Sequence, residues 1–240
     1  MRGVARASAK TLGIVGGIAP PSTVYYYRRL TAQYRARTEQ RAYPSILINS
    51  IDGAAFLELV SRPPTSVLVD YLVAAVERLA GGGAQLALFA SNTPHVVFDE
   101  VARQAPIQLI SIVEATAAVA QDQGFVRLGL IGAGITMERD FYPRVFARIG
   151  ASVVIPEAAD RHLVNDRYFG ELVHGTFRAE TRTEIASVVS RMVARDAIEA
   201  VILGGTELPL LFRDAEELDL PALDTTAIHV DAAVDWLLAD

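Results

Sequence analysis

The stretch LGIVGGIAPPSTVYYYRRL, residues 12–30, has a counterpart in LGLIGAGITMERDFYPRVF, residues 128–146. The two stretches align without a gap at an offset of 116 residues and share glycines such as Gly13 and Gly129. Each begins with a short apolar run, continues through a glycine turn and ends in an aromatic segment. This order is typical of a strand that leads through a tight turn into a helix.

A second pair of segments repeats at nearly the same distance. LALFASNTPHVVF, residues 86–98, aligns with AVILGGTELPLLF, residues 200–212, at an offset of 114. A solenoid needs at least three short repeats, which this chain lacks. The two offsets therefore indicate one duplication, with halves of about 115 residues.

Short apolar runs alternate with segments of helical periodicity in each half. We expect strands at residues 12–15, 45–48, 86–90, 108–110, 128–131, 151–155, 200–203 and 220–223, with helices such as 67–79 and 180–194 between them. Such alternation produces βαβ units and a mainly parallel sheet. The sequence predicts an α/β fold with two pseudo-symmetric lobes, each containing a parallel four-stranded sheet.

We expect the first lobe to comprise residues 1–118 together with 212–240, and the second lobe residues 119–211. In this prediction the C-terminal helix, from His229 onward, packs on the first lobe. The basic stretch at residues 1–10 is expected to be a disordered tail.

Composition and charge exclude several classes of protein. Among 240 residues, 51% are apolar and 21% are charged, which is typical of a folded soluble protein. The net charge of −6 argues against nucleic acid as a partner. Residues 79–98 form the longest uncharged stretch, and its glycines and polar side chains make it unsuitable for a membrane span. No secretory signal pattern is present, so we expect a cytoplasmic protein without membrane partners.

Missing residue types exclude further chemistry. The chain has no cysteine, and 21 of its 22 basic residues are arginines, the exception being Lys10. This excludes disulfides, thiolate metal sites, pyridoxal-phosphate catalysis through an interior lysine and a Walker-type phosphate loop. The four histidines show no metal-binding spacing. We expect neither a cofactor nor a metal.

Polar clusters follow four of the predicted strands, at the sheet edge where α/β proteins bind ligands. The substrate-binding candidates in and around these clusters are Gly17, Asn92, Thr93, Thr136, Arg167, Gly205 and Thr206. The catalytic candidates are Ser91, Glu207 and His95. Pseudo-symmetry would bring these residues to one cleft between the lobes, where backbone N–H groups at helix starts favour an anionic group.

Simpler interpretations of the same residues stay open. Residues 91–93 could serve only as a helix cap, because Ser, Asn and Thr are preferred there. His95 could make a structural hydrogen bond, and Glu207 and Arg167 could be solvated surface charges. The glycine pairs lack the full dinucleotide-binding spacing and are typical of tight turns.

Five ordered motifs carry a family resemblance: LGIVGGIAP, SNTPH, LGLIGAGIT, ILGGTELPLL and LPALDTTAIHVDAA. Together they resemble the aspartate/glutamate racemase superfamily, and most closely its aspartate racemase branch. The resemblance extends from Leu12 to the final helix. It implies a two-lobed α/β enzyme that needs no cofactor, acts on a small carboxylate and forms a homodimer.

The chain departs from the family pattern at the catalytic positions. Family segments corresponding to residues 90–93 and 204–207 read Ala-Cys-Asn-Thr and Gly-Cys-Thr-Glu, and those two cysteines exchange the α-proton. Ser91 and Gly205 stand there in this chain. A serine hydroxyl is a poor base without activation, and glycine has no side chain, so a two-thiol proton shuttle is excluded. The substrate-binding arginine expected soon after the second strand is also missing, since no arginine occurs between residue 49 and Arg62.

Three functional hypotheses follow. The first is an enzyme with changed chemistry, an isomerase, lyase, decarboxylase or cyclisation catalyst for a small carboxylate or keto acid, with Glu207, His95 or Ser91 as acid or base. Relatives resembling arylmalonate decarboxylase replace one cysteine with glycine, which fits this idea. The second is a residual racemase that uses other residues, and the third is a non-catalytic carboxylate-binding protein. We expect Gly205 to leave room for a bulky substrate, unless a neighbouring side chain fills the space.

Overall fold

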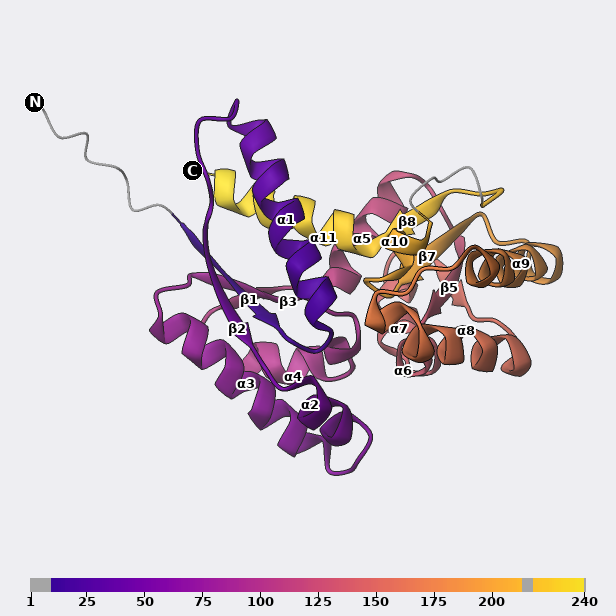
Figure 1. Ribbon diagram of the computed structural model, residues 1–240, viewed down its shortest axis with the longest axis horizontal. Coiled ribbons are helices and arrows are strands. Elements are labelled where there is room, and N and C mark those ends of the chain that lie inside the picture. Colours follow the sequence, from indigo (N-terminus) through magenta and orange to yellow (C-terminus); the bar gives the residue numbers. More distant parts are fainter. Residues whose placement is uncertain (1–9, 213–217, 240) are drawn as a thin grey trace, which may run out of the picture.

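The computed structural model describes residues 10–212 and 218–239. It contains two parallel four-stranded sheets with strand orders β2-β1-β3-β4 and β6-β5-β7-β8 (Figure 1). The two orders are equivalent, as the duplicated sequence requires. The predicted α/β fold with two four-stranded parallel lobes is confirmed.

The first sheet and its helices are built from β1 (Thr11–Gly16), α1 (Pro20–Arg37), β2 (Ser45–Ser50), α2 (Gly53–Val60), α3 (Thr65–Gly81), β3 (Leu86–Phe89), the 3₁₀ turn η1 (Thr93–Val97), α4 (Phe98–Gln104) and β4 (Gln108–Ile110). Alternate residues of β1 enter different cores. Ile14 packs with α1 and the C-terminal helix, whereas Val15 packs with α2 and α3. Burial on both faces explains the continuous apolar runs of these strands.

The second sheet and its helices are built from α5 (Ile112–Asp122), β5 (Arg127–Gly132), α6 (Gly134–Glu138), α7 (Phe141–Ala147), β6 (Ser152–Val154), α8 (Ala158–Gly170), η2 (Leu172–His174), α9 (Ala179–Asp196), β7 (Ala200–Gly204), α10 (Leu208–Leu211) and β8 (Ala222–Asp224). In β7, Ile202 packs toward α5 and α7, and Leu203 packs toward α8 and α9. Helices therefore cover both faces of this sheet too.

The chain crosses between the lobes at points that differ from the expected boundaries. Leu223 of β8 pairs with Ile202 of β7, so the chain returns to the first lobe only after residue 224 rather than at 212. Ile112 and Ala117 of α5 lie in the core of the second lobe, so this lobe begins before residue 119. The single hydrophobic pattern of a helix does not reveal which of two similar sheets it covers.

The last helix, α11 (Thr225–Leu238), runs beside α1 (Figure 1). Its residues Val230 and Val234 share a core with Leu30 of α1. Lys10 Nζ donates a 3.0 Å hydrogen bond to the carbonyl of Trp236 in this helix. The rest of the tail expected to be disordered, residues 1–9, lies outside the described residues. No described helix is both long and apolar enough to cross a membrane.

Candidate functional site

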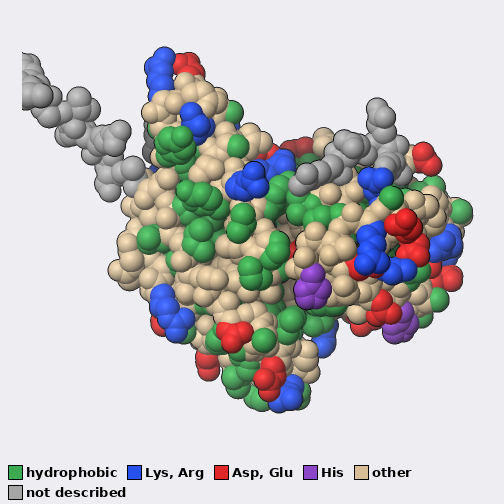
Figure 2. Space-filling model, viewed as in Figure 1, with side chains coloured by type: hydrophobic (Ala, Val, Ile, Leu, Met, Phe, Trp, Pro, Cys, Tyr) green, Lys and Arg blue, Asp and Glu red, His purple; other side chains and the backbone are tan. Residues whose placement is uncertain are grey.

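A cavity of about 390 Å³ lies where the strand ends of the two lobes meet, and Figure 2 shows the surface hollowed between the lobes. Five predicted site residues line it: Gly17, Ser91, Thr93, Thr206 and Glu207. The remaining lining residues are Ile18, Ala19, Pro20, Gly53, Ala54, Leu57, Ala133, Tyr168, Phe169, Val173 and His174. Its volume is within the range of about 300–1,000 Å³ that small-molecule sites commonly have.

Gly17 shapes the turn that carries β1 into α1. Its φ of 91° is left-handed, and a Cβ there would lie 2.7 Å from the backbone nitrogen of Ile51, so only glycine fits. The Gly17 N–H donates to Thr23 Oγ1 at 2.9 Å. This donor is therefore already used, and the turn shapes the cavity wall without offering that N–H to an anion.

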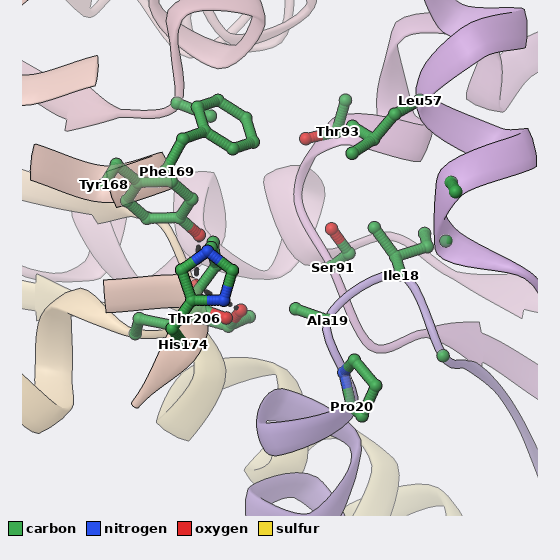
Figure 3. A pocket seen from close by; sticks show the side chains of 16 residues that line it. Ile18, Ala19, Pro20, Leu57, Ser91, Thr93, Tyr168, Phe169, His174 and Thr206 are labelled. Atoms are coloured by element: carbon green, nitrogen blue, oxygen red, sulfur yellow. Dashed lines mark hydrogen bonds between the residues drawn. The ribbon is translucent and has the colours of Figure 1, made fainter. Parts of the chain in front are cut away.

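Ser91 and Thr93 follow β3 on the first-lobe wall, and their hydroxyl groups face the cavity (Figure 3). Within residues 10–212 and 218–239, neither hydroxyl has a protein hydrogen-bond partner. Because no base contacts Ser91 Oγ, nothing activates it as a nucleophile. Both hydroxyls are free to donate to a ligand.

Glu207 lies on the opposite wall and is fully buried. Its carboxylate accepts hydrogen bonds from the hydroxyls of Ser22 and Tyr168. Thr206 Oγ1 lies 3.0 Å from Glu207 Oε2 and 2.8 Å from Ser22 Oγ, so its single proton serves one of these two acceptors. No arginine or lysine of the described chain forms an ion pair with Glu207. Neutral hydroxyls alone thus hold a carboxylate at the cavity wall, which is the arrangement of an acid–base group rather than of a structural ion pair.

Tyr168, on α8, fills the space beside Gly205. A Cβ on Gly205 would lie 2.9 Å from the Tyr168 hydroxyl oxygen and closer still to the ring edge. The expectation that Gly205 leaves room for a bulky substrate is therefore wrong, and the alternative of a neighbouring side chain is correct. Burial, followed by the nearby charge of Glu207, raises the pKa of Tyr168 well above its usual value, so the phenol stays protonated.

Asn92 is buried at the junction of the lobes and is not among the lining residues. Its amide nitrogen donates to Thr225 Oγ1 at 3.3 Å, and its amide oxygen accepts from the hydroxyl of Tyr142. These partners come from α11 and α7. Asn92 therefore connects segments of both lobes instead of contacting the cavity.

His95 also lies away from the cavity wall. Its Nδ1 is 3.1 Å from the Asn92 carbonyl, and its Nε2 accepts from the Ile112 backbone N–H at 3.1 Å. The ring stacks on Phe98. Burial lowers the pKa of His95 to about 3. With both nitrogens bonded to the backbone, His95 has no free position for acid–base chemistry.

Arg167 does not reach the cavity either. Its guanidinium binds both carboxylate oxygens of Glu184, at 2.7 and 3.0 Å, and Glu171 at 2.9 Å. Two carboxylates thus neutralise the side chain that was expected to hold a substrate carboxylate. Arg62, the first arginine after β2, instead pairs with Glu58 on the surface at 2.5 Å.

Thr136 is fully buried behind the cavity wall, and its hydroxyl has no partner among the described residues. The neighbouring N–H of Gly134 donates to Asn165 Oδ1 at 2.8 Å. Gly134 and Thr136 therefore do not line the cavity.

Sequence reasoning missed Ser22, Tyr168 and Phe169. Tyr168 and Phe169 directly follow Arg167. The sequence of a helix does not indicate which of its side chains will face the ends of strands that are distant in the chain. Ser22 lies in the first turn of α1, two residues after a cavity-lining proline. Residues two apart in a helix lie on different faces, so the position of Pro20 gave no signal for Ser22.

Comparison with known proteins agrees with this architecture. The family model described as Asp/Glu/hydantoin racemase matches residues 15–233. The chain belongs to this family. The racemase family member described here has no cysteine, so neither lobe supplies a catalytic thiol.

Solved structures of similar chains include several racemase-like proteins. A candidate Asp/Glu racemase from Yersinia pestis is 31% identical, with 96% of this chain and 100% of that chain covered and a TM-score of 0.87. An aspartate racemase homologue from Pyrococcus horikoshii OT3 is also 31% identical over the same shares, with a TM-score of 0.83. The aspartate racemase of Picrophilus torridus, 21% identical over 95% of this chain and 94% of that chain, has a TM-score of 0.76 and shows likeness of fold alone.

The name of a similar curated protein states no activity. An uncharacterised protein from the pnlA 3′ region of Pectobacterium carotovorum subsp. carotovorum is 23% identical over 140 residues, which is 58% of this chain and 91% of that one. Within the part of the racemase family member that the structure describes, no cluster of three or more His, Asp or Glu side chains could hold a metal ion.

Proposed function

We propose that this protein is a cofactor-independent isomerase that moves a proton on one face of a small carboxylic acid or keto acid. The single observation that carries the proposal is the buried Glu207 carboxylate, hydrogen-bonded to the Tyr168 phenol at the cavity wall. On the opposite wall stands Ser91, which no base activates. Acid–base groups are therefore concentrated on one side of the bound substrate.

The proton balance of this reaction is simple. The carbon next to the substrate carbonyl gives its proton to the Tyr168 oxygen while the phenolic proton passes to Glu207. The same groups then return one proton to the same face of the substrate, at that carbon or at a conjugated neighbouring atom. No electrons are lost or gained, so the reaction requires no redox cofactor. The raised pKa of Tyr168 favours a concerted transfer in which the free phenolate does not accumulate.

Substrate positioning falls to the other wall. The unpartnered hydroxyls of Ser91 and Thr93 can donate two hydrogen bonds to one carboxylate. Ser91 thus serves in binding, and Glu207 with Tyr168 serves in proton transfer. A racemase needs proton-transfer groups on both faces of the carbon, which this arrangement does not supply.

The decisive experiment follows deuterium exchange by NMR with a panel of 2-keto acids, β,γ-unsaturated acids and monosubstituted malonates in D₂O. We expect deuterium to enter one face only, and Glu207→Gln and Tyr168→Phe each to slow exchange by about 10²–10⁴-fold. Ser91→Ala should raise KM more than it lowers kcat. Circular dichroism verifies that each variant is folded.

Four results would contradict the proposal. Exchange on both faces would indicate a residual racemase. Unchanged exchange rates in Glu207→Gln and Tyr168→Phe would show that other residues carry out the proton transfer. Release of CO₂ from the malonates without exchange in the other acids would indicate a lyase. Carboxylate binding without any reaction would identify a non-catalytic binding protein.

Two further expectations stay predictions. We propose a homodimer, supported by exposed apolar side chains on α1, where Val24 and Tyr27 are 57% and 46% exposed. Sedimentation equilibrium tests it, and a monomer at micromolar concentration would contradict it. We also propose a cytoplasmic location, which fractionation of the native cells tests.

A further inference from the structure

The cavity wall carries no lysine or arginine to match a second carboxylate. None of the sixteen described lining residues is lysine or arginine, and the one acidic residue among them is the buried Glu207. Arg167 is next to Tyr168 in the chain, yet Glu184 and Glu171 already neutralise it. A dicarboxylate would therefore bring two negative charges toward a third without a lysine or arginine to offset them, in surroundings where charge repulsion is poorly screened.

Helix α2 contributes small and apolar side chains to the cavity. Gly53, Ala54 and Leu57 line it from this helix, and Ile18 continues the same wall. The free hydroxyls on this side, Ser91 and Thr93, suffice for one carboxylate. One other lining side chain, the exposed His174 on the second-lobe wall, carries a ring nitrogen without a partner among the described residues.

Two large apolar side chains stand at the cavity on opposite walls. Leu57 is 36% exposed and Phe169 is 38% exposed, and Figure 3 shows them facing the same space from the two lobes. Figure 2 shows a dense group of charged side chains on the outer face of the second lobe and scattered ones over the first lobe, with a histidine beside the hollow between the lobes. An apolar ligand group placed between Leu57 and Phe169 would remove both surfaces from water.

We propose that the site selects a monocarboxylic acid with an aryl or branched alkyl substituent and discriminates against dicarboxylates, including aspartate and glutamate. This inference rests on the proposed function for the location of the reacting carbon, but selectivity depends only on the walls. The carboxylate lies at Ser91 and Thr93, and the apolar substituent lies between Leu57 and Phe169. Leu57 is the specificity-determining residue on the first lobe.

Calorimetric titration with three probes separates the contributions. Butyrate and succinate have the same number of carbons and differ by one carboxylate, whereas phenylacetate and butyrate are both monoanions and differ in apolar bulk. We expect phenylacetate to bind at least about tenfold more tightly than butyrate, and butyrate more tightly than succinate, which corresponds to about 1.4 kcal/mol for each tenfold step. Succinate binding as tightly as phenylacetate would overturn the proposal.

A matched pair of variants tests the role of Leu57. Leu57→Arg should weaken phenylacetate binding and strengthen succinate binding, each by roughly tenfold, because it replaces apolar surface with a cation. Val67→Arg adds the same charge on α3, at a 48% exposed position that does not line the cavity, and should leave all three affinities unchanged. Equal effects of the two variants would show that the added net charge alone changes the affinities, and would reject Leu57 as the specificity-determining residue.

Binding and turnover distinguish this proposal from the preceding one. If phenylacetate binds as expected while no acid of the panel exchanges deuterium, the substrate class stands and the proposed reaction fails. If a dicarboxylate exchanges on one face with a dependence on Glu207, the reaction stands and the substrate class fails.

Discussion

Tyr142, on a helix of the second lobe, donates a 2.6 Å hydrogen bond to Asn92 Oδ1 at the end of a first-lobe strand. Both side chains are buried, and Asn92 also donates to Thr225 at the start of α11. The bond therefore links the lobes at the point where their strand ends meet. It also assigns Asn92 to the lobe junction rather than to the ligand.

Asn92→Ala should consequently act on stability. It leaves the Tyr142 hydroxyl buried without its acceptor, which costs about 1–3 kcal/mol. Urea unfolding measures this loss. The double variant Asn92→Ala with Tyr142→Phe should be less destabilised than the sum of the two single variants, because it removes both partners. Strictly additive losses would show that the two side chains do not interact.

Gly205→Ala should displace Tyr168, because the added Cβ overlaps the phenol ring. We expect a loss of about 1–3 kcal/mol in the free energy of unfolding from overpacking, together with loss of deuterium exchange. Gly170→Ala is the matched control, since a Cβ there has no neighbour within 4 Å. Adding Tyr168→Ala to Gly205→Ala should recover stability but not exchange. Unchanged stability and exchange in Gly205→Ala would show that the Tyr168 ring moves aside without a loss in the free energy of unfolding.

Aspartate and glutamate should not be racemised. Neither face of the substrate meets a thiol, and no lysine or arginine lines the cavity to bind the second carboxylate. Ser91→Cys should not create the activity, because Tyr168 occupies the space of the opposing thiol. Chiral chromatography after long incubation provides the measurement. D-isomer formation at an ordinary enzymatic rate, about 1–10³ per second, would reject this expectation.

Acid should destabilise the protein through two buried histidines. Burial lowers the pKa of His95 to about 3 and that of His229 to about 4, while unfolded histidine titrates near 6.5. The unfolded chain therefore binds protons first. The contribution of these two histidines to the free energy of unfolding is fully present above pH 6.5. It is lost as the pH falls toward their pKa values in the folded protein, at up to about 1.4 kcal/mol per pH unit for each histidine.

Unfolding midpoints between pH 7 and pH 4.5 test this linkage. His229→Gln should remove the contribution of one of the two buried histidines to the slope of the free energy of unfolding against pH. His162→Gln, at an exposed position of α8, serves as the control and should leave the slope unchanged. Identical slopes for His229→Gln and the parent protein would show that His229 does not titrate on unfolding.

Much of the fold was determined by the sequence itself. The repeat that begins at Leu12 and Leu128 predicts two equivalent units, and every predicted strand lies within two residues of an observed one. Ligands bind at the carboxyl ends of parallel strands, and this rule predicts that Ser91 and Glu207 share one cavity. Both residues line the observed cavity. Apolar runs of strand length and the glycine turns after them are local signals, so they can be recognised without knowledge of distant contacts.

Tertiary structure alone decided the roles of the side chains. The hydrogen bond between Tyr168 and Glu207 spans 39 residues, and the ion pair that occupies Arg167 involves Glu184, which is 17 residues away. The sequence left both a structural and a catalytic role open for His95, and its ring nitrogens contact the Asn92 carbonyl and the Ile112 N–H. Whether a polar group is free or already bonded depends on partners that packing brings together across the chain. Local sequence carries no record of those partners, because hydrogen bonding and burial are set by distance in space.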